Sequence, residues 1–145
     1  MANKVDLALL RHLRQNSREH LTIIGREYGI PMTTLIGSIN RMQPGIVQKC
    51  TTLVDFSKLG FGIRAGFALQ AKERPSRKKL EEFLMANKST NNVMRLSGEH
   101  DFLVEGLFRN ITELYLFEEE LKKFGLSRFE EIHFVEELEC ESFVP

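Results

Sequence analysis

The spacing of apolar residues changes near residue 60, and this change constrains the fold more than any other feature of the sequence. In the first 50 residues, apolar side chains recur every three or four positions, the period of one face of an α-helix. In residues 61–72 they occupy every second position, which is typical of a β-strand with one buried face. We therefore expect an α+β protein, in which an all-helical N-terminal domain precedes a domain of strands and helices.

Three short helices are predicted in residues 1–50. The first covers residues 5–15, the second runs from Leu21 to Tyr28, and the third ends near Met42. Each has one apolar stripe that can contribute to a shared core. The stripes are formed by Leu9, Leu10 and Leu13, by Leu21, Ile24 and Tyr28, and by Leu35, Ile39 and Met42.

A short turn joins the second and third predicted helices. Gly29 directly follows the second helix, where glycine readily adopts the left-handed conformation that ends a helix. Pro31 suits the first turn of the next helix, because its missing N–H has no helical partner there. Pro44-Gly45 ends the third helix, and Gly25 is small enough for the second and third helices to cross closely. Helix, glycine-containing turn and helix together form a helix-turn-helix pattern.

The outward side of the third predicted helix carries groups that can bind double-stranded DNA. Hydroxyl and guanidinium groups form hydrogen bonds with base edges and phosphates. The predicted DNA contacts are Thr33, Thr34, Ser38 and Arg41, together with the basic residues Arg26 and Lys49. The same pattern is also compatible with a plain three-helix bundle that binds no nucleic acid.

Residues 61–145 follow the order strand, helix, strand, strand, helix, strand. The predicted strands are residues 61–72, 91–97, 102–109 and 128–138, and the predicted helices are residues 76–87 and 112–124. Thr112 is expected to cap the second helix, and Gly125 is expected to end it. This βαββαβ order is that of a ferredoxin-like domain, a four-stranded antiparallel sheet with two helices on one face.

One face of this sheet is expected to lie against the two helices. The inward helix residues are Leu80, Phe83 and Leu84 in the first helix, and Leu114, Phe117, Leu121 and Phe124 in the second. Strands 61–72 and 102–109 are apolar on both faces, so the opposite sheet face would be exposed in a monomer. An exposed apolar face indicates a partner, and we predict a two-fold homodimer formed through the sheets. Alternatively, the N-terminal domain covers this sheet face.

The formal net charge is zero, but charge is unevenly distributed along the chain. Residues 1–60 contain eight Lys or Arg and four Asp or Glu, a net charge of +4, which leaves −4 on the remainder. A basic segment favours a polyanionic partner, and an acidic segment is repelled by one. The charge distribution therefore favours nucleic-acid binding by the N-terminal part, although an imbalance of this size also arises by chance.

The chain is expected to be a cytoplasmic protein with free thiols. No apolar run approaches the roughly 18 residues of a membrane span. Asp6 and Arg11 interrupt the apolar residues at the N-terminus, so no signal peptide is predicted. Cys50 and Cys140 stand alone without the spacing of metal ligands, and the histidines are scattered along the chain. We therefore predict no metal site, no cofactor and no membrane partner.

Four segments spread along the chain combine into a recognisable order. They are VDLALLRHLRQNSR, GREYGIPMTTLIGSINRM, GIVQKCTTLVDFSKLGFG and LSGEHDFLVEG. They resemble the opening helix, the helix-turn-helix, the hinge and the "G-x-x-D" hairpin of the Lrp/AsnC (feast/famine) family of transcription regulators. The resemblance implies a DNA-binding domain in residues 1–50, a hinge in residues 51–60, and a ferredoxin-like domain for effector sensing and oligomerisation in residues 61–145.

The resemblance further implies a repressor or activator that binds pseudo-palindromic DNA as a dimer and that often assembles into octamers or larger rings. Family members typically bind an amino acid between dimers, near the hairpin. Gly98 and Asp101 match the hairpin motif, and Glu99 and His100 fill its variable positions, so these four residues form the predicted effector site. From the residues alone, Gly98 supplies a positive φ, and Asp101 either accepts from an α-ammonium group or caps the turn.

The third predicted helix departs from the family pattern. Family members often carry several Arg or Lys on its outer face, whereas only Arg41 is basic here. Fewer phosphate contacts weaken binding. Affinity is then modest and raised by oligomerisation, or the DNA site is unusual, or the chain acts through a paired homologue.

Two other functions remain open at the level of the sequence. One is a sensing or assembly protein with a degenerate DNA reader. The other is an enzyme similar to the sirohaem decarboxylases, whose second strand carries conspicuous histidine and arginine residues. Residues 91–97 contain Arg95 but no histidine, so we predict that the chain is not an enzyme.

Overall fold

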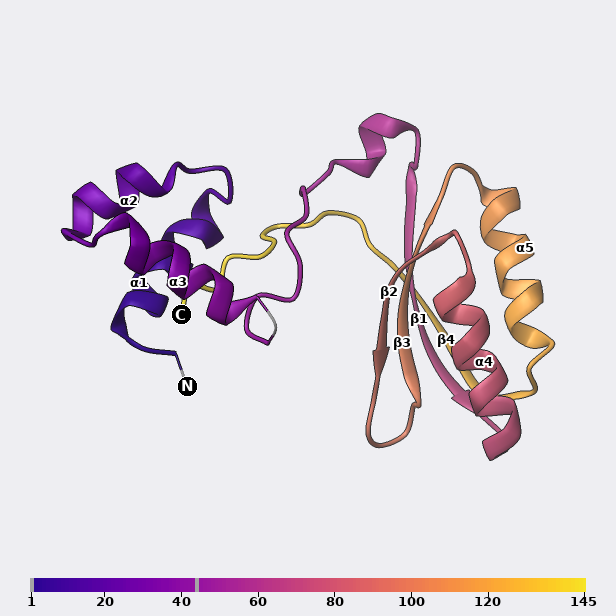
Figure 1. The fold of residues 1–145 in the computed structure, drawn as a ribbon. Coiled ribbons are helices and arrows are strands. Elements are labelled where there is room, and N and C mark those ends of the chain that lie inside the picture. The colour runs from indigo at the N-terminus through magenta and orange to yellow at the C-terminus, as the bar shows by residue number, and fades with distance from the viewer. Residues whose placement is uncertain (1, 44) are drawn as a thin grey trace. The chain divides into compact units, whose positions relative to one another are not determined.

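The computed structural model describes residues 2–43 and 45–145, which form two compact units. The helical unit consists of Met1–Leu53 together with Leu138–Pro145, and the sheet unit consists of Val54–Glu137. Figure 1 shows the helices of the first unit in indigo and purple, and the strands of the second in magenta, orange and yellow. The chain therefore passes between the units twice.

The helical unit contains the three predicted helices, α1 (Lys4–Gln15), α2 (Leu21–Tyr28) and α3 (Met32–Met42). Its core is small. The buried apolar residues are Leu9, Ile24, Leu35 and Met42, with Val5, Leu10, Leu13, Leu21, Ile30, Ile39 and Val47 packed around them. The predicted stripes thus meet in one core. Tyr28 is an exception, because it is exposed at the end of α2 and its hydroxyl lies 3.2 Å from His12 Nε2.

The turn between α2 and α3 has the predicted conformation with one difference. Gly29 has a φ of 63°, the left-handed conformation expected of a glycine that ends a helix. Pro31 precedes α3 as its N-cap residue, one position before the first helical turn where it was predicted, because its ψ of 142° is extended. A methyl group on Gly25 would lie 2.9 Å from the carbonyl oxygen of Ile30 and 3.4 Å from Leu35 Cδ1 of α3, so the tightest approach is to the turn and the next is to α3. The predicted stop residue Pro44 lies outside the described residues.

The segment Leu138–Pro145 belongs to the helical unit, whereas the sequence grouped it with residues 61–145. Arg14 Nη1 forms an ion pair with Glu141 Oε2 at 2.6 Å, and its Nε donates to the carbonyl oxygen of Phe143 at 3.0 Å. Arg11 Nε donates to the carbonyl oxygen of Pro145 at 2.8 Å. Acidic residues of this segment therefore accompany the basic N-terminal helices, which weakens the charge difference predicted between the two parts of the chain.

The sheet unit has the predicted βαββαβ order and a ferredoxin-like architecture. It contains a short 3-10 helix, Phe56–Leu59, and then β1 (Ile63–Ala71), α4 (Arg74–Ala86), β2 (Thr90–Arg95), β3 (Phe102–Phe108), α5 (Ile111–Lys122) and β4 (Leu126–His133). The four strands lie in the order β2-β3-β1-β4, and all neighbours are antiparallel. Helices α4 and α5 cover the same face of the sheet (Figure 1).

Two predicted features of the sheet unit are wrong in detail. Thr112 does not cap α5, because Asn110 precedes the helix in an extended conformation and its side chain accepts from the Glu113 N–H at 3.0 Å. The last strand ends at His133 instead of residue 138. Its register along β1 ends at the pair Ala65 and His133, and one more backbone hydrogen bond runs from the Phe134 N–H to the Arg64 carbonyl oxygen at 3.1 Å.

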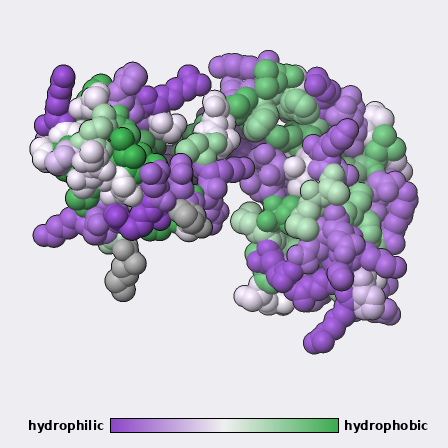
Figure 2. Space-filling view, viewed as in Figure 1, coloured by the Kyte–Doolittle hydropathy of each residue, from purple (hydrophilic) through white to green (hydrophobic). Residues whose placement is uncertain are grey.

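The core of the sheet unit is larger and rich in aromatic residues. Its buried members among the described residues are Ala65, Phe67, Leu69, Leu80, Leu84, Phe102, Val104, Phe108, Leu114, Phe117 and Leu121. The ring of Phe67 contacts the rings of Phe108, Phe117 and Phe129, with centroids 5.2–6.3 Å apart. The predicted inward stripes of both helices are therefore confirmed. On the surface, green hydrophobic patches interrupt the purple polar area of both units in Figure 2.

Candidate nucleic-acid interface

Helix α3 exposes one long side to solvent. Thr33, Ile36, Gly37 and Asn40 have the i, i+3, i+4, i+7 spacing of one helical face, and all four are exposed. We call these four residues the outer stripe. Within the described part of the chain, no outer-stripe side chain forms a hydrogen bond or ion pair. Thr34 lies beside the stripe and is exposed as well, so Thr33 and Thr34 are placed on the surface as predicted.

Ser38 lies on the opposite side of α3, and its predicted exposure to DNA is wrong. It is buried, at 1% exposure, and its hydroxyl donates to Asp6 Oδ1 at 2.7 Å. The reason is helical geometry, since Ser38 falls three residues after Leu35 and four before Met42, on the inner stripe. A buried hydroxyl needs a partner, and the carboxylate of α1 provides one.

Asp6 joins α1 to α3 through a buried carboxylate. Its Oδ2 accepts from the Asn3 N–H at 2.8 Å, which completes a capping box at the start of α1, and its Oδ1 accepts from Ser38. Hydrogen bonds from the Ser38 hydroxyl and the Asn3 N–H, together with the Arg41 guanidinium, lower the pKa of Asp6 below its ordinary value. Asp6 therefore remains ionised and holds the two helices together at neutral pH.

Arg41 is shared between this internal contact and the surface. Its Nη2 lies 2.5 Å from Asp6 Oδ1 and 3.1 Å from Ser38 Oγ, while 56% of the side chain is exposed. The Nε and Nη1 groups form no hydrogen bond with other described residues. Arg41 can thus donate to a phosphate from a fixed position, but the full fork of its guanidinium is not available for a base.

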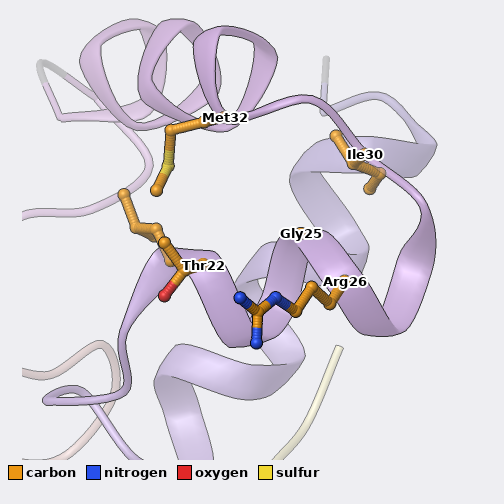
Figure 3. A pocket seen from close by; sticks show the side chains of 6 residues that line it. Thr22, Gly25, Arg26, Ile30 and Met32 are labelled. Carbon is orange, nitrogen blue, oxygen red and sulfur yellow. The ribbon is translucent and has the colours of Figure 1, made fainter.

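Arg26 and Lys49 are exposed, and neither forms an ion pair within the described residues. Arg26 also lines an open depression of about 270 Å³ between α2 and the start of α3. Figure 3 shows this depression with the lining residues Thr22, Gly25, Arg26, Ile30 and Met32 labelled. A free guanidinium beside the start of α3 is suited to a phosphate that flanks the helix.

The predicted effector hairpin has a defined geometry in the sheet unit. Gly98 has a φ of 114°, which confirms the positive φ expected there. Asp101 Oδ2 accepts from the Ala71 N–H at 3.0 Å, and its Oδ1 lies 3.2 Å from Arg77 Nε. The carboxylate therefore holds the hairpin against the end of β1 and against α4, a contact between strands that replaces the local turn cap considered from the sequence.

The two variable residues of the hairpin contact β4. Arg128 Nη1 donates to Glu99 Oε2 at 2.7 Å, and His100 Nε2 lies 3.2 Å from Glu130 Oε1. The four predicted effector residues are thus adjacent. Glu99 and Asp101 already accept hydrogen bonds from the protein, whereas the buried Nε2 of His100 forms none with the described residues despite its proximity to Glu130. A ligand would meet the exposed backbone of Gly98 first, because no heavy atom lies within 4 Å of the position of a Cβ there.

Asp6 is the functional residue that sequence reasoning missed. The available signal was its position, since Asp6, Leu9 and Leu13 share one helical face and an acidic residue on an apolar stripe needs a buried partner.

In residues 2–43 and 45–145, no three His, Cys, Asp or Glu side chains come together as a metal site. None of the helices described is long and apolar enough to cross a membrane.

Comparison with known proteins identifies relatives over most of the chain. No family model matches the sequence. HTH-type transcriptional regulator Ptr1 of Methanocaldococcus jannaschii is 32% identical over 118 residues, which cover 79% of this chain and 77% of Ptr1. The uncharacterised HTH-type transcriptional regulator PYRAB00550 of Pyrococcus abyssi is 26% identical over 124 residues, or 83% of this chain and 80% of that protein.

Solved structures share the complete fold at low sequence identity. AsnC of E. coli superimposes with a TM-score of 0.87 at 15% identity, over 100% of this chain and 99% of AsnC. The transcriptional regulator NMB0573 of Neisseria meningitidis, solved as a complex with L-Met, gives a TM-score of 0.86 at 16% identity, over 100% and 97% of the two chains. LrpC of B. subtilis gives 0.84 at 14% identity, over 96% and 98%. With a helix-turn-helix joined to a ferredoxin-like unit, and with curated relatives at this identity and coverage, the chain belongs to the Lrp/AsnC family of helix-turn-helix transcriptional regulators.

Proposed function

We propose that this regulator places the outer stripe of α3 in the major groove of double-stranded DNA and binds as a dimer or larger oligomer. The observation that carries the proposal is the exposed, unpaired face of α3, which lies directly after the turn from α2. A recognition helix placed in this way reads base edges, while the residues around it bind phosphates. A cytoplasmic location, where DNA is available, is part of the same proposal.

The predicted contacts fall into two classes. Thr33 and Thr34 lie at the start of α3 and are proposed to reach base edges or nearby phosphates. Arg26, Arg41 and Lys49 are proposed to bind phosphates, since each has exposed donor groups. Ser38 is excluded from direct contact because it is buried against Asp6.

Titration of the full chain against its own promoter fragment at two salt concentrations tests this proposal. We expect retardation at low salt that weakens as salt is added. Arg26→Ala and Lys49→Ala should each reduce the slope of log affinity against log salt by about 0.9. Lys79→Ala, an exposed lysine of α4, is the control and should leave the slope unchanged. A folded chain that retards no DNA at low salt would contradict the proposal.

We further propose that an amino acid or a similar small molecule modulates DNA binding through the hairpin of residues 98–101. Support comes from the open backbone at Gly98 and from the structural neighbour NMB0573, which was solved with L-Met. Glu99 and His100 are proposed to contact the effector in the assembled oligomer. Asp101 holds the hairpin and can still accept a further hydrogen bond, because each carboxylate oxygen has two lone pairs.

A thermal-shift screen of the twenty amino acids tests the effector proposal. A ligand that binds only the folded chain raises the melting temperature as its concentration exceeds its dissociation constant. We expect at least one amino acid to do so, and we expect Glu99→Gln or His100→Gln to reduce the shift. Glu82→Gln, an exposed residue of α4, should not reduce it. A flat screen, or equal shifts in all variants, would contradict this site.

We propose that two sheets pair through the faces opposite the helices. This face carries small or apolar residues such as Ala68 and Leu103, since Phe67 and Val104 point to the helices and strand residues alternate. It also contains Glu105, which is 7% exposed and forms an ion pair with Arg64.

Leu103→Glu should shift the sedimentation coefficient toward a monomer, whereas Leu116→Glu on exposed α5 should not. Unchanged sedimentation of Leu103→Glu would argue for a different interface.

We also propose that the chain has no catalytic role. Its curated relatives are named as transcriptional regulators. Arg95, the residue considered for the decarboxylase alternative, forms an ion pair with Glu81 of α4 at 2.5 Å. Mixing the chain with sirohaem provides the test, and a spectral shift of the sirohaem would reopen the enzymatic alternative.

A further inference from the structure

The outer stripe of α3 has a chemical composition that limits which bases it can recognise. It combines the methyl and hydroxyl of Thr33, the aliphatic side chain of Ile36, the bare backbone of Gly37 and the amide of Asn40. None of the four residues carries a charge. Ile36 is 46% exposed, so its aliphatic side chain is available to a partner.

Guanine recognition in the major groove normally uses Arg or Lys. Arg binds O6 and N7 of guanine with two parallel donors, and this is the commonest specific contact in protein–DNA complexes. On α3 the only cation is Arg41, which lies beside the outer stripe and has Nη2 committed to Asp6 and Ser38. The helix therefore has no free guanidinium fork or ammonium group directed along its outer stripe.

Adenine and thymine, in contrast, match the groups that the stripe provides. A free asparagine amide forms two hydrogen bonds with N6 and N7 of adenine, and aliphatic groups contact the C5-methyl of thymine. Asn40 forms no side-chain hydrogen bond with the other described residues, so its amide is available. No heavy atom surrounds the position of a Cβ on Gly37, so the helix backbone can approach the groove closely there.

We infer that α3 selects A·T base pairs, with Asn40 reading adenine and Ile36, assisted by Thr33, reading the methyl group of thymine. The inference rests on the proposed placement of α3 in the major groove. From Thr33 to Asn40 the helix rises about 10 Å at 1.5 Å per residue. At about 3.4 Å per base pair, this length spans about three consecutive base pairs in each half-site. Ile36 and Asn40 then address neighbouring or next-neighbouring pairs.

Binding of the full chain to modified duplexes tests the inference atom by atom. Sequences are first selected from a random duplex library at low salt, and the selected half-site is then synthesised with single replacements. Replacing thymine with deoxyuridine removes only the C5-methyl, and we expect a loss of affinity of about fourfold at one position. Replacing adenine with 7-deazaadenine removes N7 and with it one of the two hydrogen bonds, and we expect a loss of affinity between about 2- and 13-fold at another position.

Two protein variants assign each effect to its side chain. In Ile36→Ala the difference in affinity between the thymine and deoxyuridine duplexes should shrink to the part that Thr33 contributes, and in Asn40→Ala the adenine and 7-deazaadenine duplexes should bind equally. Asn40→Gln should restore part of the adenine preference, because glutamine offers the same pair of groups. Ile111→Ala and Asn91→Ala, exposed residues of the same types in the sheet unit, are the matched controls and should behave as the unmodified chain.

The possible failures of this inference and of DNA binding itself are distinguishable. Enrichment of G·C pairs in the selected half-site would overturn the inference while leaving DNA binding intact. So would Ile36 and Asn40 variants that weaken all sequences equally. A folded chain that retards no duplex at low salt would overturn the placement of α3 in the groove, and the inference with it.

Discussion

The helical unit and the sheet unit hold their helices in place by different means. In the sheet unit, eleven buried apolar residues among those described form one core around the ring of Phe67. The described part of the helical unit has four buried apolar residues in its core. The buried carboxylate of Asp6 supplements them, because it accepts hydrogen bonds from the N-cap of its own helix and from Ser38 of α3. Apolar packing is non-directional, whereas hydrogen bonds fix an orientation. The helical unit therefore has a smaller apolar core, and the hydrogen bond between Asp6 and Ser38 fixes the position of α3.

Among the substitutions considered, loss of the Phe67 ring is expected to change the free energy of unfolding the most. Phe67→Ala removes a fully buried ring from the aromatic cluster and should lower the free energy of unfolding of the sheet unit by about 3–5 kcal/mol. Urea unfolding followed by NMR can separate the units, since Tyr28 reports on the helical unit and Tyr115 on the sheet unit. Phe143→Ala, which removes an exposed ring, should change stability by no more than about 0.5 kcal/mol. Equal losses in the two variants would show that the cluster is not the core.

A pair of identical substitutions sharpens the description of the helical unit. Gly25→Ala places a methyl 2.9 Å from the Ile30 carbonyl oxygen, so the turn must shift and the helical unit should lose about 1–3 kcal/mol. Gly37→Ala meets no neighbouring atom and should gain about 0.5–1 kcal/mol from the better helix propensity of alanine. Thermal unfolding monitored at Tyr28 measures both. Changes of the same sign would contradict the proposed turn geometry.

The contribution of Asp6 should appear as a pH dependence confined to the helical unit. Its folded pKa is lowered, so its stabilising contribution is fully present above the unfolded pKa of about 4 and is lost as pH falls through the folded pKa. Asp6→Asn removes this titration. The unfolding free energies of the two proteins should therefore differ more at neutral pH than in acid. A difference that stays constant with pH would argue against an ionised Asp6.

The smallest effect is expected at the ion pair that holds the C-terminal segment. Arg14 and Glu141 are both partly exposed, and such pairs typically contribute between about 0.2 and 1 kcal/mol. Glu141→Gln should lower the stability of the helical unit by this amount at low salt, and the loss should shrink at high salt. Loss of the sheet unit's stability instead would place the segment elsewhere.

Much of the fold could be predicted from periodicity because apolar stripes report directly on burial. Leu35 and Met42 on α3, and Leu114 and Leu121 on α5, are buried as their spacing indicates. Polar residues were harder to place. The residue type of Ser38 favours the surface, although its spacing from Leu35 puts it on the inner stripe. The Asp6 carboxylate on another helix makes that burial favourable.

The candidate site was predictable in its location but not in its chemistry. The turn at Gly29 identifies α3 as the exposed second helix of the motif, but which of its polar groups are free depends on contacts with α1. The position of Leu138–Pro145 was also beyond prediction, since its contacts with Arg11 and Arg14 join residues far apart in the sequence. Long-range polar contacts of this kind leave no periodic signal.

A negative charge at Gly37 tests whether the exposed face of α3 reads DNA. The position is exposed and surrounded by open space, so a glutamate there leaves the fold intact and places a negative charge between the helix and the phosphates. Thr112→Glu adds the same charge to exposed α5. In gel retardation of the promoter fragment, we predict that Gly37→Glu abolishes binding and that Thr112→Glu binds normally. Unchanged binding by a folded Gly37→Glu protein would contradict the account.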